Sequence, residues 1–558
     1  MLSENTAACK MENVPSSGAT SAVQLTLSNY FNMNSTPEDP FESVFSTESS
    51  TAEPISAPPL DADSNHPHLD VPTDSDAMNR MRQRDAWLPS ESTLRALSNA
   101  RSSENVHHPE IKPFLSQPEL ESSAEGSILT DPYRALLLCH LKDAAAVDLI
   151  RRIPNPSDHS TGNIESLKEL VANGWYRPAL DLTRRLLTDA GFVEEQGGAT
   201  LTPLTAQIWL TRLALLVRTR NYDLAERELA SFQTLDAPNV YFEHAPELYP
   251  NRAGSIIPFS LRLLHAELPF HLSRSEEALN RLYYLLAIID RIKTNLQRGY
   301  NEDGTIAKHD QEYCSSSLRL WSSRECRVLS GCLSIYLSEY DYQAAIETVH
   351  RLAIVCAADQ SILRGLASVL GRIYLQMGDL ETAKTYFARA VSTLEHKNSP
   401  QLSTQLLFQN ALLSLGKGDY EEAKKHFQEV LSLDPTNVAA VNNMVVCSLY
   451  LGQLSGAIRV LETLLTTGLN GQVLDTSHPT PSAVLTSASV SQQDKNTTYL
   501  PVTLQRRFCL HDALVSNLAV LYEVESESAT RKKVNLLERL AALPGEPVHI
   551  SAFKLSAS

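Results

Sequence analysis

The sequence predicts an all-α protein, a solenoid of about seven to eight helical pairs preceded by a disordered acidic N-terminal tail. Three lines of text between Arg364 and Leu469 nearly repeat one another, and such repetition is typical of stacked helical units. One glycine and one alanine recur in register in each line, namely Gly378, Gly418 and Gly452 with Ala383, Ala423 and Ala457. The first part of the chain is instead rich in Ser, Thr, Pro and acidic residues without a helical period, which is typical of disorder.

The second and third lines lie 34 residues apart by both markers. This spacing is the tetratricopeptide (TPR) period and predicts a TPR-like α-solenoid. Each repeat is a pair of antiparallel helices that cannot close its own core and must stack on its neighbours. We expect small residues to let paired helices approach closely, large residues to fill the space between them, and a proline to end the second repeat. The predicted packing and turn positions are Leu370, Gly371, Tyr374, Gly378, Ala383, Phe387, Ala411, Gly418, Ala423, Phe427, Pro435, Gly452 and Ala457.

The sequence before the regular repeats shows the same pattern of small and large residues, but with less regular spacing. Marker alanines recur at Ala179, Ala225, Ala278 and Ala345, and their spacing varies because of insertions. We interpret this region as degenerate helical pairs. The insertion at residues 241–260 is aromatic and proline-rich, so it is either a binding loop on the solenoid or a packed connector.

The expected organisation begins with a disordered acidic Ser/Thr/Pro-rich tail at residues 1–76. Residues 77–130 are a linker with a short Trp-containing helix, for which Ser90 could be a cap, and a lone tryptophan such as Trp87 often docks on a domain. The remaining parts are degenerate TPR-like helical pairs (131–360), regular TPR repeats (361–470), a low-complexity insertion (471–505), a C-terminal capping helical pair (506–545) and a C-terminal tail (546–558).

The composition is that expected of a soluble cytoplasmic protein with a sizeable core. The chain has 558 residues, of which 43% are hydrophobic. No apolar run reaches the roughly 18 residues that suggest a membrane span, and no secretory signal is visible at the N-terminus, so we expect no direct membrane insertion. Residues 1–130 carry −12 of the net charge of −17. Nothing resembles the basic stripe that nucleic-acid binding requires.

No arrangement of residues predicts catalysis. The eight cysteines are dispersed without a CxxC pair, as in a reduced cytosolic protein. The sequence contains no GxSxG, HExxH, GxGxxG or P-loop motif. Acidic pairs such as Glu421 and Glu422 stand at helix starts, where they favour the helix dipole. We therefore expect no catalytic residue, no cofactor and no metal site, and the chain is not predicted to be an enzyme.

Some TPR proteins bind the C-terminal carboxylate of chaperones with Lys and Asn side chains at two fixed positions of successive first helices. The residues at these positions here are Ser368 and Arg372, Phe408 and Leu412, and Asn442 and Val446. The carboxylate clamp is missing. This disfavours a TPR peptide receptor or co-chaperone-like adaptor, which stays the alternative function, and larger protein surfaces become the expected ligand.

The irregular segments of the chain are more specific than the repeats. The strings YFEHAPELYPNRAGSIIPFSLRLLHAEL, LAVLYEVESESATRKKVNLLERLA and AVNNMVVCSLYLG, with SLRLW around Trp321, resemble the subunit 12 family of the trafficking protein particle (TRAPP) complex. The resemblance runs from about Asp131 to the C-terminus, and DAWLPSESTLRAL before it is also similar. The acidic tail is not covered by it, and the segment after Gly471 looks like an insertion.

The resemblance implies a non-catalytic scaffold subunit of a TRAPP III-type vesicle-tethering complex. Such a subunit would act in endoplasmic reticulum-to-Golgi transport and autophagy, at the ER-Golgi intermediate compartment and the Golgi. The implied partners are other TRAPP subunits, in particular the large subunits 8 and 11, with an indirect link to a Rab GTPase. No family motif assigns individual contact residues, so partner-binding residues are not predicted.

Overall fold

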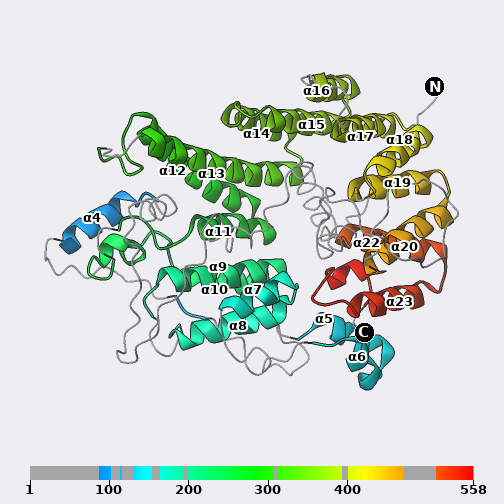
Figure 1. Ribbon diagram of the computed structural model, residues 1–558, viewed down its shortest axis with the longest axis horizontal. Helices are drawn as coiled ribbons and strands as arrows, with labels where there is room; N and C mark the ends of the chain where they lie inside the picture. The colour runs from blue at the N-terminus through cyan, green and yellow to red at the C-terminus, as the bar shows by residue number, and fades with distance from the viewer. Residues whose placement is uncertain are drawn as a thin grey trace, which may run out of the picture.

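The computed structural model describes residues 87–101, 113–115, 130–153, 164–192, 199–249, 252–306, 311–392, 400–435, 437–470 and 510–556. Within these ranges every regular element is a helix, apart from isolated bridges such as Tyr241 with Ser255 and Tyr300 with Ile306. The predicted all-α solenoid is confirmed (Figure 1). No helix in the described ranges is long and apolar enough to cross a membrane.

Eight helical pairs follow one another between residues 164 and 541 of the described chain. They are α7 (Ile164–Ala172) with α8 (Tyr176–Asp189), α9 (Pro203–Arg218) with α10 (Tyr222–Ala230), α11 (Phe259–His271) with α12 (Ser275–Gln297), α13 (Gln311–Ser338) with α14 (Tyr342–Val355), α15 (Gln360–Gln376) with α16 (Leu380–Ser392), α17 (Pro400–Gly416) with α18 (Tyr420–Leu433), α19 (Val438–Tyr450) with α20 (Leu454–Asn470), and α22 (Asp512–Glu525) with α23 (Ala529–Ala541). The degenerate and regular halves thus share one plan.

The turns inside the pairs are more uniform than the sequence suggests. In every described pair the second helix begins four residues after the first ends. The middle residue of the turn has a positive φ in seven of these eight turns: Gly174, Arg220, Ser273, Tyr340, Gly378, Gly418 and Gly452. An aspartate follows Gly378, Gly418 and Tyr340, and its side chain accepts a hydrogen bond from a backbone N–H of the next helix. For example, the Glu422 N–H donates to Asp419 Oδ1 at 3.1 Å. This capping begins the second helix.

Close contact between paired helices explains the small residues of the regular repeats. A Cβ atom added to Gly371 would lie 2.5 Å from ring atoms of Phe387, so only glycine fits there. Ala423 is fully buried, and the Phe408 and Phe427 rings pack edge to face with centroids 5.5 Å apart. The second repeat is therefore held by interlocking small and large side chains.

Replacing Ala423 with leucine is expected to lower the free energy of unfolding by about 1–3 kcal/mol, because the larger side chain has no space in this contact. Thermal unfolding followed by circular dichroism measures the change. Lys425→Leu, at an exposed position of the same helix, is the control and should leave the melting temperature nearly unchanged. Equal melting temperatures for all three proteins would show that Ala423 does not lie in a tight helix contact.

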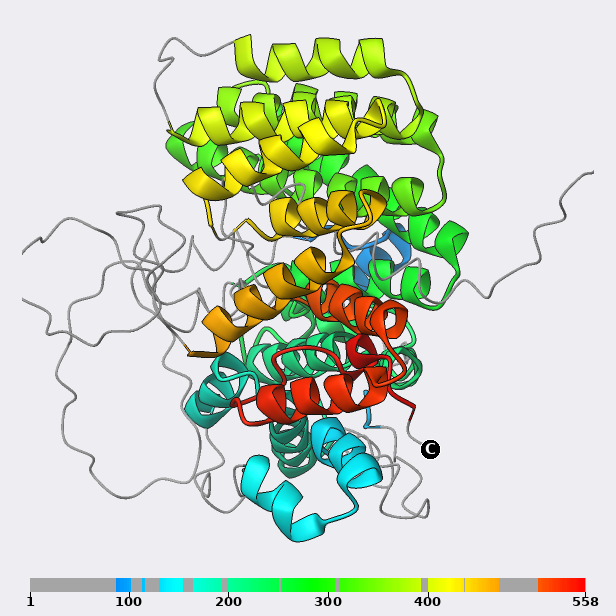
Figure 2. The same cartoon turned by 90° about the vertical axis from the view of Figure 1, so that its right-hand side faces the viewer.

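The described helices close on themselves rather than forming an open array. Two short helices lie directly before the eight pairs in the described chain, α5 (Pro132–Leu141) and α6 (Ala144–Ile150). They share a core with α20, α22, α23 and the short 3-10 helix η4 (Ile550–Phe553). In Figure 1 the cyan α5 and α6 accordingly lie beside the red α23, and Figure 2 shows the red helices directly above the cyan ones. The last pair therefore packs against α5 and α6, the helices that come directly before the first pair.

One detail differs from the sequence-based expectation. Residues 546–558 were expected to form a tail, whereas Val548 and Phe553 are buried in the core that α5 shares with α22. In the same region Lys142 adopts a left-handed φ of 56° and separates α5 from α6.

The linker tryptophan lies on the domain. Trp87 is only 4% exposed, and its ring centroid lies 6.2 Å from that of Phe259 and 6.3 Å from that of Trp321. Helix α4 (Glu91–Arg101) follows it and packs near the 3-10 helices η2 (Pro238–Val240) and η3 (Phe242–His244). Thr93 Oγ1 donates to the carbonyl oxygen of Asp236 at 2.6 Å. The predicted tail at 1–76 and the predicted insertion at 471–505 lie outside the described residues.

The insertion at 241–260 is a packed connector. Tyr241 and Phe242 are each 1% exposed, and Ile257 is equally buried. The Phe242 N–H donates to the Gly254 carbonyl at 3.0 Å beside the bridge between Tyr241 and Ser255. Of the two interpretations left open by the sequence, the structure supports the packed connector, because these aromatic side chains face the core.

Candidate interaction surface

The sequence-predicted repeat positions lie in the interior or in turns. Gly378, Gly418 and Gly452 occupy left-handed turn positions, Pro435 follows α18, and the Tyr374 ring stacks on that of Tyr386. The other positions are buried between helices: Leu370, Gly371, Ala383, Phe387, Ala411, Ala423, Phe427 and Ala457. These residues shape the fold and present almost nothing to a ligand.

The positions of the missing carboxylate clamp are used for packing between successive first helices. The Arg372 guanidinium lies 5.4 Å from the centroid of the Phe408 ring. Gln409 Nε2 donates to Ser368 Oγ at 3.3 Å, and Asn442 accepts a hydrogen bond from the side chain of Asn517 on α22. This inner face is thus already occupied by internal contacts, which leaves other surfaces for partners.

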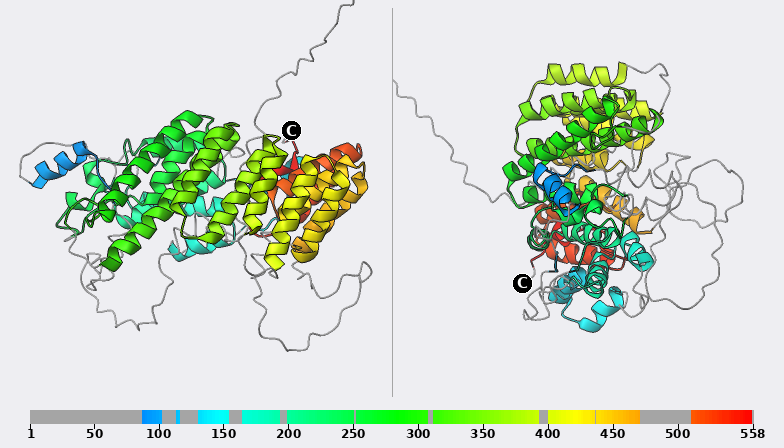
Figure 3. Two further views of the ribbon diagram at one scale, coloured as in Figure 1. Left: turned by 90° about the horizontal axis from the view of Figure 1, so that it is seen from above. Right: turned by 90° about the vertical axis from the view of Figure 1, so that its left-hand side faces the viewer.

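The edge formed by the turns inside the pairs is the candidate interaction surface, and we call it the turn edge. It comprises residues 218–222, 271–277, 338–342, 376–380, 416–420 and 450–454. All these turns lie on one side because every pair runs in the same sense, as the parallel rows of helices in Figure 3 illustrate. Tyr340 is 65% exposed there, Tyr450 66% and Met377 48%. Exposed tyrosine and methionine are enriched in protein interfaces.

The degenerate half of the turn edge carries side chains where the regular half has glycine. Arg220, Ser273 and Tyr340 adopt φ values of 60°, 61° and 60°. A non-glycine residue costs roughly 1 kcal/mol in this conformation. Such local strain is typical of positions where the side chain has a use. Arg220 has an evident one, since its guanidinium lies 3.4 Å from the carboxylate of Asp512 on α22.

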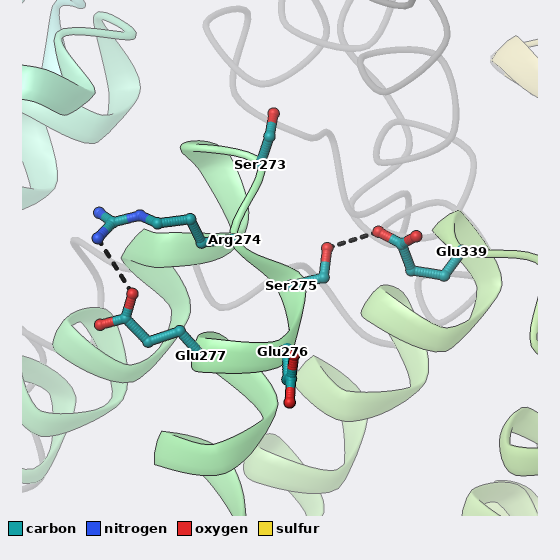
Figure 4. A pocket seen from close by; sticks show the side chains of 6 residues that line it. All are labelled: Ser273, Arg274, Ser275, Glu276, Glu277 and Glu339. Atoms are coloured by element: carbon teal, nitrogen blue, oxygen red, sulfur yellow. Dashed lines mark hydrogen bonds and ion pairs between the residues drawn. The ribbon is translucent and has the colours of Figure 1, made fainter.

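Ser273 and the Tyr340 turn border a shallow acidic notch of about 460 Å³, shown in Figure 4. The notch is lined by Ser273, Arg274, Ser275, Glu276, Glu277 and Glu339. Ser275 Oγ donates to Glu339 at 2.5 Å, and the Arg274 guanidinium lies 3.0 Å from Glu277 and also pairs with Glu226. Glu276 is exposed. With three glutamates and one arginine, the lining of the notch carries a net negative charge.

Two stacked ring pairs tie neighbouring turns together. The Tyr222 ring lies parallel to the His271 ring with centroids 4.7 Å apart, and Tyr420 stacks on Tyr450 at 4.5 Å. In both pairs the first residue of a second helix meets the last residue of the next first helix. Burial lowers the pKa of His271 to about 4, so this ring is neutral at physiological pH.

Because the folded-state pKa of His271 lies below its usual value of about 6.5, stability is expected to fall as the pH drops from 6.5 towards 4, where only the unfolded chain binds the proton. His271→Phe keeps the ring stack and removes this effect. The unfolding free energy of the natural protein should therefore fall relative to the variant by roughly 2–3 kcal/mol at pH 4. Urea titrations at several pH values measure the difference, and parallel pH profiles would contradict the prediction.

A closing junction joins the first helices to the C-terminal residues, and Arg151 is its central side chain. The Arg151 side chain is fully buried. Its guanidinium donates to the carbonyl oxygens of Ala541 at 3.2 Å, Leu543 at 2.9 Å and Gly545 at 2.7 Å. Its Nε donates to Asp131 at 2.9 Å. Arg151 thus satisfies carbonyl groups left at the end of α23, which otherwise lack helical partners.

Aromatic and glycine contacts complete the closing junction. The guanidinium of Arg151 lies 4.7 Å from the ring centroid of Trp175 and 5.0 Å from that of Tyr133. Tyr133 Oη donates to the Val548 carbonyl at 2.6 Å and accepts from the Val548 N–H at 3.2 Å. Burial raises the pKa of Tyr133, so the hydroxyl keeps its proton. A Cβ atom on Gly545, whose φ is 75°, would lie 2.3 Å from the Asn173 carbonyl oxygen.

The closing junction is not evident from the sequence. Its residues lie up to 415 positions apart in the sequence, and the sequences around them share no repeat. The isolated glycines in VANGWY and LPGEP were the available signal, because such glycines mark close backbone approaches. The Glu546 N–H donates to the Gly174 carbonyl at 2.9 Å, so these two glycines do meet.

Comparisons with known proteins agree with the fold and extend beyond it. Models described as tetratricopeptide repeat match residues 368–393 and 414–471. "Trafficking protein particle complex subunit 12" from Mus musculus is 34% identical over 477 residues, which cover 85% of this chain and 54% of the relative. The Homo sapiens protein of the same name is 33% identical over 477 residues, covering 85% and 59%. "BBSome complex member BBS4" from Bos taurus is 30% identical over 142 residues, covering 25% and 22%. The chain spans a little over half the length of the two subunit 12 relatives.

Proposed function

Because this chain is a tetratricopeptide-repeat protein homologous over 85% of its length to subunit 12 of trafficking protein particle complexes, we propose that it is a non-catalytic scaffold subunit of a TRAPP III-type vesicle-tethering complex. Its role is in endoplasmic reticulum-to-Golgi transport and autophagy. It acts from the cytoplasm, peripherally at the ER-Golgi intermediate compartment and the Golgi. Its partners are other TRAPP subunits, in particular the large subunits 8 and 11, and its link to a Rab GTPase is indirect.

The observation that supports this proposal is the extent of the similarity. The matched length of 477 residues greatly exceeds the two repeat segments at 368–393 and 414–471. TPR repeats alone are shared by proteins of many functions. A match of this length includes degenerate pairs, so it is more specific than the repeats.

Affinity purification of the tagged full chain from cells, followed by mass spectrometry, tests the proposal. Co-purification of TRAPP subunits, with subunits 8 and 11 among them, is the expected result. Recovery of chaperones without any TRAPP subunit would favour the alternative, a peptide receptor or co-chaperone-like adaptor. Recovery of neither class would also overturn the proposal.

The turn edge is proposed as one contact surface for these partners, and Tyr340→Gly is the sharpest test. Glycine adopts the left-handed turn conformation without strain, so the variant should be at least as stable as the natural protein. If Tyr340 contacts a partner subunit, its loss should weaken binding about tenfold or more, as at interface hot spots. Quantitative co-purification and thermal unfolding of the same preparations measure the two effects.

Leu149→Ser is the matched control for Tyr340→Gly. Leu149 is 71% exposed on α6, away from the turn edge, so this variant removes an exposed apolar side chain elsewhere. Full partner recovery is expected with Leu149→Ser. Full recovery with Tyr340→Gly as well would remove Tyr340 from the contact surface but leave membership of the complex intact, which the purification of the natural chain decides separately.

A further inference from the structure

Two cysteines from neighbouring helices meet at the α13–α14 pair. Cys326 lies on α13 and Cys356 caps the end of α14. Their Sγ atoms are 3.2 Å apart, and both residues are partly exposed. A disulfide bond requires about 2.05 Å between sulfurs, so an approach of roughly 1 Å would bring the two sulfurs to bonding distance.

Ion pairs at the same level hold the helices around these sulfurs. Glu325, next to Cys326, is buried and lies 2.6 Å from Lys293 of α12 and 3.0 Å from Arg351 of α14. Arg351 lies on the same helix as Cys356 and also pairs with Asp290 of α12 at 3.2 Å. These contacts restrict sliding of α13 against α14. These ion pairs therefore help to hold the two sulfur atoms close to each other.

The cysteine pair lies at the open end of the helix pair. The turn at residues 339–341 joins the other end of α13 and α14, and α15 begins at Gln360, shortly after Cys356. A covalent bond here would close a loop spanning 30 residues. It would fix the end of α14 just where the degenerate half of the solenoid passes into the regular repeats.

We propose that Cys326 and Cys356 form an oxidation site, at which a peroxide converts the two thiols to an intramolecular disulfide. In the first step a thiolate sulfur attacks the peroxide; for hydrogen peroxide the O–O bond breaks, hydroxide leaves and the sulfur becomes a sulfenic acid. In the second step the other thiol attacks that sulfur, the S–S bond forms, and the sulfenic hydroxyl leaves as water with the thiol proton. Two thiols are oxidised and one peroxide is reduced to two water molecules.

The two sulfurs are equivalent in their accessibility to a peroxide, since both residues are partly exposed. Burial and the contact with Cys356 raise the pKa of the Cys326 thiol. Either thiol can be oxidised first, and the other then attacks it. Of the other described cysteines, Cys332 and Cys447 are buried, while Cys139 and Cys314 are partly exposed.

Peptide mapping of the purified full chain tests the proposal. The reduced protein is treated with hydrogen peroxide, its free thiols are blocked, and it is digested with trypsin without reduction. Cleavage at arginine yields residues 325–327 and residues 352–364 as the peptides that carry Cys326 and Cys356. The expected result is a product in which these two peptides are joined, with loss of two free thiols per chain and recovery of both after dithiothreitol.

Three serine variants sharpen the test. Cys326→Ser and Cys356→Ser should each abolish the joined peptides, and Cys326→Ser should allow a sulfenic acid on Cys356 to be trapped with dimedone. Cys314→Ser changes a partly exposed cysteine of the same helix and should leave the joined peptides unchanged. Failure to form them at peroxide concentrations that oxidise glutathione would overturn the proposal, as would joining of Cys326 or Cys356 mainly to other cysteines or to a second chain.

Discussion

Replacing Arg151 with methionine is expected to lower the free energy of unfolding by about 3–5 kcal/mol, the range for breaking a buried ion pair by removing one partner. The variant leaves Asp131 without its buried cation and removes the hydrogen bonds to the carbonyls of Ala541, Leu543 and Gly545. Methionine fills much of the same space, so the loss is mainly polar. Urea unfolding followed by circular dichroism measures the change.

Arg134→Met is the matched control for the closing junction. Arg134 lies on α5 and pairs with Asp148 at 2.8 Å, but the two side chains are 36% and 56% exposed. Exposed ion pairs contribute about 0–1 kcal/mol, so this variant should unfold almost like the natural protein. Hydrogen exchange adds a spatial readout, because Arg151→Met should speed exchange in α5 and α23 more than in α15 to α18. Equal losses for the two variants would show that Arg151 has no special role.

The helices of the regular repeats could be predicted because their signals are local. The glycine at each turn, and the aspartate that follows Gly378 and Gly418, act within a few residues, and the structure places both glycines in the left-handed conformation that such turns need. The degenerate pairs were recognisable from their buried alanines, but not the uniformity of their turns. The turns at Arg220, Ser273 and Tyr340 could not be recognised because they lack glycine, and a sequence pattern does not show which side chains adopt a positive φ.

The closing junction and the buried ion pairs could not be predicted because they depend on contacts between distant segments. Arg151 stands next to Arg152 in the string LIRRI, and an exposed side chain is the usual outcome for an arginine. Residues 541–545, far away in the sequence, supply three of its partners, the carbonyl oxygens of Ala541, Leu543 and Gly545. Arg212 is a similar case within LTRLALL, since its burial requires Glu228 from the paired helix. Likewise, the turn edge becomes a surface only when successive turns align.

Removing either partner of the Arg212–Glu228 pair is expected to cost about 3–5 kcal/mol of unfolding free energy, whereas removing both should cost far less. Arg212 of α9 is 5% exposed and Glu228 of α10 is fully buried. Both oxygens of Glu228 accept from the guanidinium, at 2.6 and 2.8 Å. Burial raises the pKa of Glu228, and the hydrogen bond from Arg212 opposes that shift. Each single variant therefore leaves an uncompensated polar group in the core.

The double variant Arg212→Met with Glu228→Leu should recover most of this loss, to within about 1–2 kcal/mol of the natural protein, because apolar side chains of similar volume replace a pair whose attraction only offsets its desolvation. Arg212 also donates to the Leu180 carbonyl at 3.2 Å, but that oxygen keeps the hydrogen bond from Thr183 Oγ1 at 2.8 Å. Urea unfolding of the four proteins gives the coupling energy directly. Additive losses would contradict this account, since they would mean that each side chain is stabilised independently of the other.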